Sequence, residues 1–139
     1  MPGKETTRKP PAAAGGSAAE ARAMAFAIEA ARHLSDDKCV DVLVLDVRAL
    51  SQVTDFIVIG TGTSDRQMRS SLKNVEEFGE ASGNPVFRSS TDDRATWLLA
   101  DFVDVIVHVF EPNARAHYDL EMLWGDAPRL EWQRPSPKR

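Results

Sequence analysis

The fold is decided by residues 54–67, which read TDFIVIGTGTSDRQ. The apolar run at residues 56–61 is too short for a typical helix, so it predicts a strand that is buried on both faces. Residues 60–65 then predict a tight turn, and Ser64 followed by Gln67 predicts a capping box at the start of a helix. A buried strand that leads through a tight turn into a helix indicates an α/β protein.

The residues before this stretch predict one helix and one more strand. Ser17 and Glu20 match a capping box, and residues 35–37 end the helix that follows. Residues 40–47 are rich in Val and Leu, which predicts a second strand buried on both faces. The apolar face expected on the helix consists of Met24, Ile28, Ala31 and Leu34.

The residues after it predict a helix closed by Gly83 and Pro85, and then three strands. The strands are a short one at residues 86–87 and a hairpin made of residues 96–100 and 105–110. Residues 89–94 read as a polar connection. The apolar face expected on the helix consists of Met68, Leu72, Val75 and Phe78.

Two short helices complete the expected order of elements. Pro112 permits a helical turn through Tyr118, and Asp119 can cap a last helix over residues 120–124. The whole order predicts an α/β fold with a mixed, mainly five-stranded sheet flanked by helices.

Length and charge set the domain organisation. A chain of 139 residues with 42% hydrophobic residues fits one domain, which we place at residues 17–132. Residues 1–16 lack large apolar side chains after Met1 and predict a disordered tail, and residues 133–139 form a basic tail. A single cysteine, no apolar block long enough to cross a bilayer and no targeting pattern favour a cytoplasmic protein.

The net charge of −4 conceals basic ends and an acidic middle. Residues 20–132 hold 20 acidic and 11 basic residues, a net charge of −9, because the ends take one acid and six bases of the total. This charge disfavours direct recognition of nucleic acid, which depends on Lys and Arg contacts with phosphates. A basic protein surface is the better electrostatic match.

Several motifs suggest chemistry only weakly. The turn at residues 60–64 lacks the glycine and lysine pattern of phosphate-binding loops, and Ser64 lacks the context of a nucleophile. Asp101 and Asp104 are too few for a two-metal centre. The histidines are scattered, and His108 reads as a hydrogen-bonded structural residue. We therefore expect no metal site, no cofactor and no catalytic residue.

The last third of the chain interleaves large apolar side chains with acids. Between residues 95 and 126 there are six acids and one base, Arg115, together with two tryptophans and a tyrosine. Aromatic anchors within an acidic rim suit a site for a basic protein, because aromatic residues dominate interface energies and charge sets orientation.

Three blocks of the sequence, at residues 54–67, 97–110 and 118–126, strongly resemble the ribosomal silencing factors, also called the Iojap-like family. The resemblance spans about residues 20 to 127. It implies a nucleotidyltransferase-like fold without the catalytic set, and a translation repressor that binds the large ribosomal subunit. In this family the contact is ribosomal protein fourteen of that subunit, and occupying it blocks joining of the small subunit under nutrient limitation.

With this resemblance, we expect partner contacts from one set of residues, in which the two tryptophans are anchors: Trp97, Leu99, Asp101, Asp104, Tyr118, Glu121 and Trp124. Val103 stands where the family usually has glycine, which argues against a left-handed backbone at that position. The alternative function is a nucleotide-binding or nucleotidyl-transferring enzyme that uses residues 60–64 with Asp101 and Asp104. Exposed aromatic residues also allow a homodimer.

Overall fold

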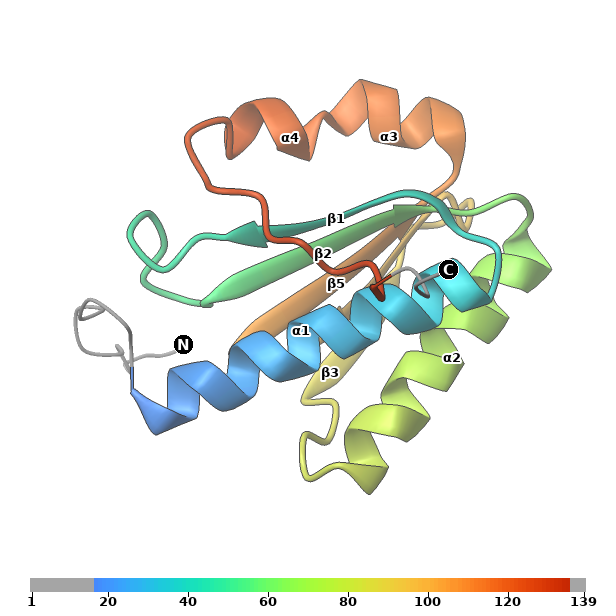
Figure 1. The fold of residues 1–139 in the computed structure, drawn as a ribbon. Helices are drawn as coiled ribbons and strands as arrows, with labels where there is room; N and C mark the ends of the chain where they lie inside the picture. Colours follow the sequence, from blue (N-terminus) through green and yellow to red (C-terminus); the bar gives the residue numbers. More distant parts are fainter. Residues whose placement is uncertain (1–16, 136–139) are drawn as a thin grey trace.

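A computed structural model describes residues 17–135 and shows one sheet with helices on both of its faces (Figure 1). The predicted tail at residues 1–16 and the end of the basic tail, residues 136–139, lie outside the described residues. The elements are α1 (Ala18–Asp36), β1 (Val40–Asp46), β2 (Phe56–Thr61), α2 (Asp65–Ala81), β3 (Arg88–Thr91), β4 (Trp97–Asp101), β5 (Val105–Phe110), α3 (Pro112–Tyr118) and α4 (Leu120–Leu123).

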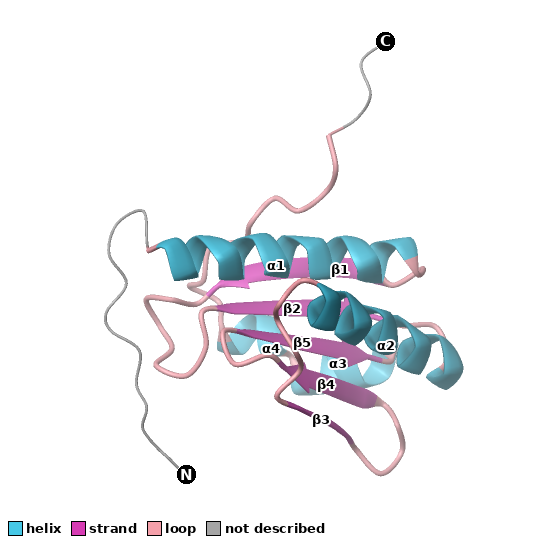
Figure 2. Ribbon diagram, turned by 90° about the horizontal axis from the view of Figure 1, so that it is seen from below, coloured by secondary structure: helices cyan, strands magenta, loops and turns pink. Residues whose placement is uncertain are grey.

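The sheet is mixed, as the sequence predicts. Its strand order is β1-β2-β5-β4-β3 (Figure 2). β2 and β5 run parallel in the centre, and the other three pairs are antiparallel, including the predicted β4–β5 hairpin. All six residues of β2 are buried, which confirms the reading of residues 56–61 as a strand covered on both faces.

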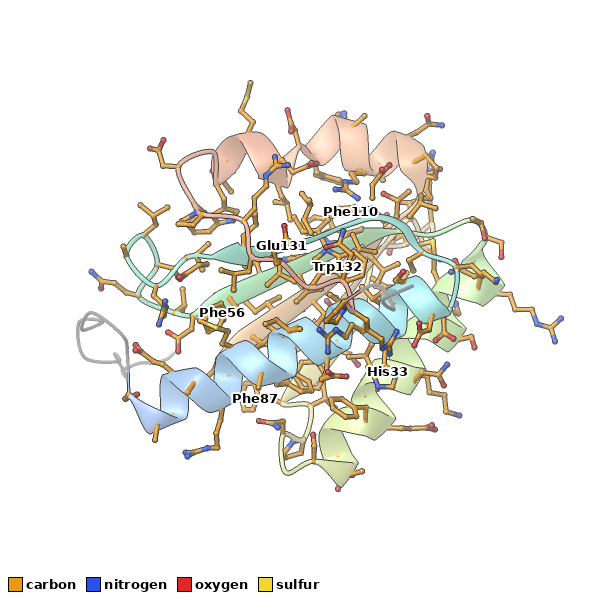
Figure 3. The ribbon with its side chains drawn as sticks, viewed as in Figure 1. His33, Phe56, Phe87, Phe110, Glu131 and Trp132 are labelled. Carbon is orange, nitrogen blue, oxygen red and sulfur yellow. The ribbon has the colours of Figure 1, made fainter. Side chains whose placement is uncertain are left out.

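The face of the sheet beneath α1 and α2, here called the closed face, holds the larger core. Phe56, Val58 and Val107 lie in it, each without exposed surface. Figure 3 shows Phe56 between β2 and α1, whereas Phe110 lies on the opposite side of the sheet, under α3. Burial of this much apolar surface is the dominant stabilising contribution to the fold.

α1 begins as predicted, but its buried face differs from the prediction. Ser17 accepts a hydrogen bond from Glu20 N and donates its own N–H to the Glu20 carboxylate, which confirms the capping box. Met24 and Ile28 are only half-buried. Most residues of the buried face are alanines, which let the helix approach the sheet closely. This face consists of Ala23, Phe26, Ala27, Ala30, Ala31 and Leu34.

α2 has the predicted serine cap but not the full capping box. Ser64 Oγ accepts from Gln67 N at 3.1 Å, whereas Gln67 Oε1 accepts from Thr63 N rather than from the cap residue. The Gln67 amide nitrogen donates to Asp37 O, so this side chain ties the start of α2 to the end of α1. Gly83 has φ +85°, as expected for a glycine that ends a helix.

The prediction that residues 40–47 form a strand buried on both faces is wrong at its beginning. Val40 is 50% exposed, and the register with β2 is irregular between Val40 and Leu43. Asp41 has φ +51°, which fits a bulge. Only from Val42 onward do alternate side chains enter the two cores, because β1 is the first strand of the sheet rather than a central one.

The third strand lies later than predicted. The sequence favours residues 86–87, but β3 is Arg88–Thr91, within the run expected to be a polar connection. Its four residues are all exposed, and Phe87 is 67% exposed. β3 forms because it pairs with β4, and a strand at the end of a sheet needs no apolar pattern.

Residues 127–134, here called the C-terminal strap, cross the outer edge of β1. Asp46 N donates to Pro128 O at 2.9 Å and Leu130 N donates to Val44 O at 2.8 Å. Trp132 Nε1 donates to Val42 O, and Figure 3 shows its ring beside α1. The strap ends with Arg134 in two hydrogen bonds with Asp36, so the start of the predicted basic tail is anchored to α1.

Candidate partner-binding site

The face of the sheet under α3 and α4, here called the half-open face, is covered only in part. The β4 side chains Trp97, Leu99 and Asp101 lie on it, opposite their β5 partners Phe110, His108 and Ile106. Ile57 and Ile59 of β2 are fully buried there, but Leu99 and Ile106 are half-buried. Burial on this face therefore falls from β2 toward β4.

Four rings cluster at the β4–β5 end of this face. Trp97 lies with its ring centre 4.5 Å from that of Tyr118 and 5.1 Å from that of Phe110. Trp97 Nε1 donates to His108 Nδ1 at 3.0 Å. His108 is 7% exposed, and burial lowers the pKa of its imidazole to about 4. The prediction of a hydrogen-bonded structural histidine is confirmed, and the ring is neutral at pH 7.

The two aspartates of the β4–β5 turn have different surroundings. Asp101 Oδ1 accepts from Val103 N at 2.8 Å, and Oδ2 lies 3.5 Å from Arg88 Nε, so this carboxylate holds the turn together. Asp104 is exposed, and its backbone oxygen accepts from Asp55 N and Phe56 N at the start of β2. Val103 has φ +76°, so the expectation that a valine argues against a left-handed backbone there is wrong.

Glu121 is also engaged within the molecule. Its Oε1 accepts from Arg115 Nε at 3.1 Å, and Arg115 donates to Thr61 Oγ1 at 2.7 Å. Arg115 is the base that the acidic segment contains, and it links α3 and α4 to the end of β2. The Glu121 charge is therefore shared with an internal partner.

The most exposed apolar residues of this region lie on α4. Met122 is 77% and Leu123 is 70% exposed, and Tyr118 at the end of α3 is 44% exposed. Trp97 and Trp124 are half-buried and pack against the core of the half-open face. The candidate set of residues omits Met122 and Leu123. Helical spacing does not single them out, because Leu123 lies three residues after Leu120 and would share its side with Leu120 and Trp124.

The turn at residues 60–64 is structural. A Cβ placed on Gly62 would lie 2.1 Å from Met68 Cγ, and one on Gly60 would lie 3.0 Å from Leu34 Cδ1. Glycine at these positions lets α2 and α1 pack closely on the sheet, which confirms the interpretation of a packing turn. Ser64 caps the start of α2.

The two halves of the alternative nucleotide site lie at opposite ends of the sheet. Phe56 pairs with Val105 beside the Asp101–Asp104 turn, whereas Thr61 pairs with Phe110 beside the glycine turn. The six residues of β2 separate the two ends by about 17 Å. Carboxylates and a phosphate turn that act on one phosphate must converge on it, so the structure does not bring this constellation together.

Residues 17–135 also bear on two other classes of site. They contain no cluster of three or more His, Cys, Asp or Glu side chains that could hold a metal ion. No helix in this part of the chain combines the length and apolar character needed to span a membrane.

Comparisons with known proteins give one consistent result. A family model described as ribosomal silencing factor during starvation matches residues 19–139. The chain is 38% identical to ribosomal silencing factor RsfS of Bacillus subtilis, over 71% of this chain and 84% of that protein. It is 35% identical to RsfS of Halalkalibacterium halodurans, over 73% and 87%. A crystal structure of a Chromobacterium violaceum protein superposes with a TM-score of 0.67 and 33% identity, over 84% of this chain and 89% of that one.

Proposed function

The chain belongs to the ribosomal silencing factor family, and from that premise we propose that it binds the large ribosomal subunit and prevents the small subunit from joining. The contact is ribosomal protein fourteen of the large subunit, reached through the half-open face. The outcome is repression of translation when nutrients are scarce. The observation that supports this proposal is a sheet face left partly uncovered beside the exposed apolar residues of α3 and α4.

The half-open face has the chemistry of a protein-binding surface. Leu99 and Ile106 offer apolar area on the sheet, and Tyr118, Met122 and Leu123 add exposed apolar area on the helices. Exposed apolar patches on a soluble protein are typical of interaction sites. The half-buried Trp97 and Trp124 support this apolar area from below, so their contribution to binding is partly indirect.

Charge around this face favours a basic partner. Asp104 is exposed, and the segment from residue 95 to residue 126 carries six acids against one base. Asp101 and Glu121 add negative potential although their carboxylates have internal partners. Complementary charge of this sign speeds association with a cationic surface and fixes its orientation.

Sedimentation with purified large subunits tests the proposal directly. The wild-type chain should pellet with large subunits, and the double variant Met122→Ser with Leu123→Ser should bind roughly tenfold more weakly, because it removes apolar contact area. The matched control is Leu50→Ser with Val53→Ser, which changes two residues exposed by 48% and 81% in the β1–β2 connection. Equal binding by both double variants would place the interface elsewhere.

Two further measurements test the role of charge in binding and the oligomeric state of the chain. Raising the salt concentration should slow association with large subunits, because exposed charges are screened within about a Debye length. Sedimentation equilibrium of the chain alone distinguishes self-association through the same apolar area from a monomer that binds only the subunit. A dimer that dissociates on adding large subunits would still agree with the proposal.

A further inference from the structure

The two outer edges of the sheet differ in what covers them. At β1, the C-terminal strap pairs with the strand, and Leu45 forms an antiparallel bridge with Arg129. At the other end of the strand order, β3 has β4 on one side and no strand of the described chain on its outer side (Figure 2). Within residues 17–135, one edge is thus closed by an extended segment and the other is left open.

The pairing of β3 with β4 shows which backbone groups of β3 point away from the sheet. Asp92 N donates to Trp97 O, directly after the pairing of Thr91 with Leu98, which fixes the alternation of the ladder. Arg88 and Ser90 therefore pair inward, and Ser89 and Thr91 turn their N–H and C=O groups outward. An unpaired row of this kind is a template for an added strand.

A hollow of about 390 Å³ lies beside this edge, between β3 and α2. Ser89 and Thr91 line it, because their partners Ala100 and Leu98 face the closed side of the sheet. Leu72 and Leu98 contribute its apolar lining, and the charged residues in its wall are Arg69, Lys73 and Glu76. A helix beside an open edge strand is the arrangement in which an added strand inserts alternate side chains into a groove.

The charge of the hollow favours an acidic partner. Its lining carries two bases and one acid, a net +1, within a middle region of net −9. Lys73 has no ion pair among residues 17–135, and Arg69 pairs only with the exposed Asp65, at 2.7 Å. Side chains of an added strand that are paired with Ser89 or Thr91 point to the same side as these two residues, over Arg69 and Lys73.

We propose that the β3 edge and the α2 hollow bind an extended, acidic segment of a partner protein, which pairs with β3 as a sixth strand and places alternate carboxylates over Arg69 and Lys73. This surface is separate from the half-open face, because the hollow lies on the closed side of the sheet. Nucleic acid is the weaker fit, since a phosphate backbone can accept from the outward N–H groups but offers no donor to the outward C=O groups and no apolar side chain to the lining.

The test uses the full chain and a short, acetylated peptide that alternates threonine and glutamate. In two-dimensional NMR, this peptide should shift the amide signals of residues 69–73 and 88–91 and slow hydrogen exchange at Ser89 and Thr91. A peptide that alternates threonine and lysine should leave these signals in place. Absence of shifts with the acidic peptide, or equal shifts with both peptides, would overturn the proposal.

Two sets of variants locate the contact. Thr91→Pro removes an N–H that points outward and should abolish peptide binding, while the inward bonds of β3 stay intact. Arg69→Gln with Lys73→Gln should weaken binding roughly fivefold. The matched control, Arg94→Gln, removes an exposed cation outside the hollow and should change nothing. If the double variant binds as tightly as the wild type, the carboxylates do not lie where we place them.

This result is independent of the subunit test. Thr91→Pro should still sediment with large subunits, because the half-open face is unchanged. If an oligouridine shifts the same amide signals and the acidic peptide does not, the edge proposal is overturned in favour of an RNA contact, and the proposed function is unaffected.

Discussion

The same strands form both faces of this sheet, but helices bury one face more completely than the other. On the closed face, two helices of 19 and 17 residues cover the sheet, and Phe56, Val58 and Val107 have no exposed surface. On the half-open face, α3 and α4 have seven and four residues, and Leu99 and Ile106 stay half-buried. The long helices of the closed face therefore contribute mainly to stability, whereas the short helices of the half-open face leave apolar area available for contact.

The largest expected effect is on the closed face. Phe56→Ala removes a fully buried ring that also lies 5.3 Å beneath the Arg48 guanidinium, and should cost about 3 to 5 kcal/mol of unfolding free energy. Leu99→Ala, on the half-open face, should cost about 1 kcal/mol or less, because less apolar area is lost from the interior. Urea unfolding measures both. Equal losses would remove the distinction between the two faces.

A smaller effect comes from the buried histidine of the half-open face. Burial lowers the pKa of His108 to about 4 from 6.5, so the unfolded chain binds the proton first as the pH falls. Stability contributed by the neutral ring is complete above pH 6.5 and declines between pH 6.5 and pH 4, by about 2 kcal/mol between pH 6.5 and pH 5.

Urea unfolding at a series of pH values tests this. His108→Gln keeps an acceptor for Trp97 Nε1 but does not titrate, so its stability should change less over this range than that of the wild type. His117→Gln, at an exposed position, is the control and should follow the wild type. A wild-type profile that is flat down to pH 5 would contradict the burial of His108.

The smallest effect is a gain in stability at the turn that joins the two strands of the hairpin. Val103 has φ +76° and is 52% exposed, so Val103→Gly relieves backbone strain of about 1 to 3 kcal/mol with little loss of burial. Glycine adds unfolded-chain entropy of about 0.5 to 1 kcal/mol, which leaves a net stabilisation of about 0 to 2.5 kcal/mol.

Thermal unfolding of Val103→Gly can be set against the opposite change at a comparable backbone angle. Gly83 has φ +85°, and a Cβ there would meet nothing within 4 Å, so Gly83→Ala isolates the cost of the left-handed backbone. It should destabilise by about 1 kcal/mol. A destabilised Val103→Gly would show that the valine side chain contributes more to the turn than its backbone angle costs.

The sequence predicts most helices and strands of the fold, but it misplaces β3 and the buried face of α1. Caps, glycine turns and apolar runs are local signals, and they place α1, α2, β2 and the hairpin correctly. β3 carries no such signal, because a polar edge strand exists only through pairing with β4. The buried face of α1 is also misplaced, since alanines give little hydrophobic pattern although they allow the closest packing.

For the candidate site, the sequence suggests a set of residues but not the state of each side chain. The acidic, aromatic segment contributes Trp97 and Trp124 to the half-open face, whereas its Phe102 lies in the core of the closed face. Whether Asp101 and Glu121 are free depends on Arg88 and Arg115, which lie 13 and six residues away along the chain. The roles of Met122 and Leu123 depend on which side of a four-residue helix meets the sheet, which the sequence pattern alone leaves open.

The C-terminal strap links α1 and β1 to residues that are synthesised about 100 positions later. Arg32 Nε donates to Trp132 O across 100 positions of sequence, and Trp132 Nε1 reaches Val42 O across 90. Contacts of such long range form late, because a long loop must close first. During synthesis, the β1 edge therefore stays uncovered until residue 132 has emerged, and a prematurely terminated product would display that edge to other chains and to proteases.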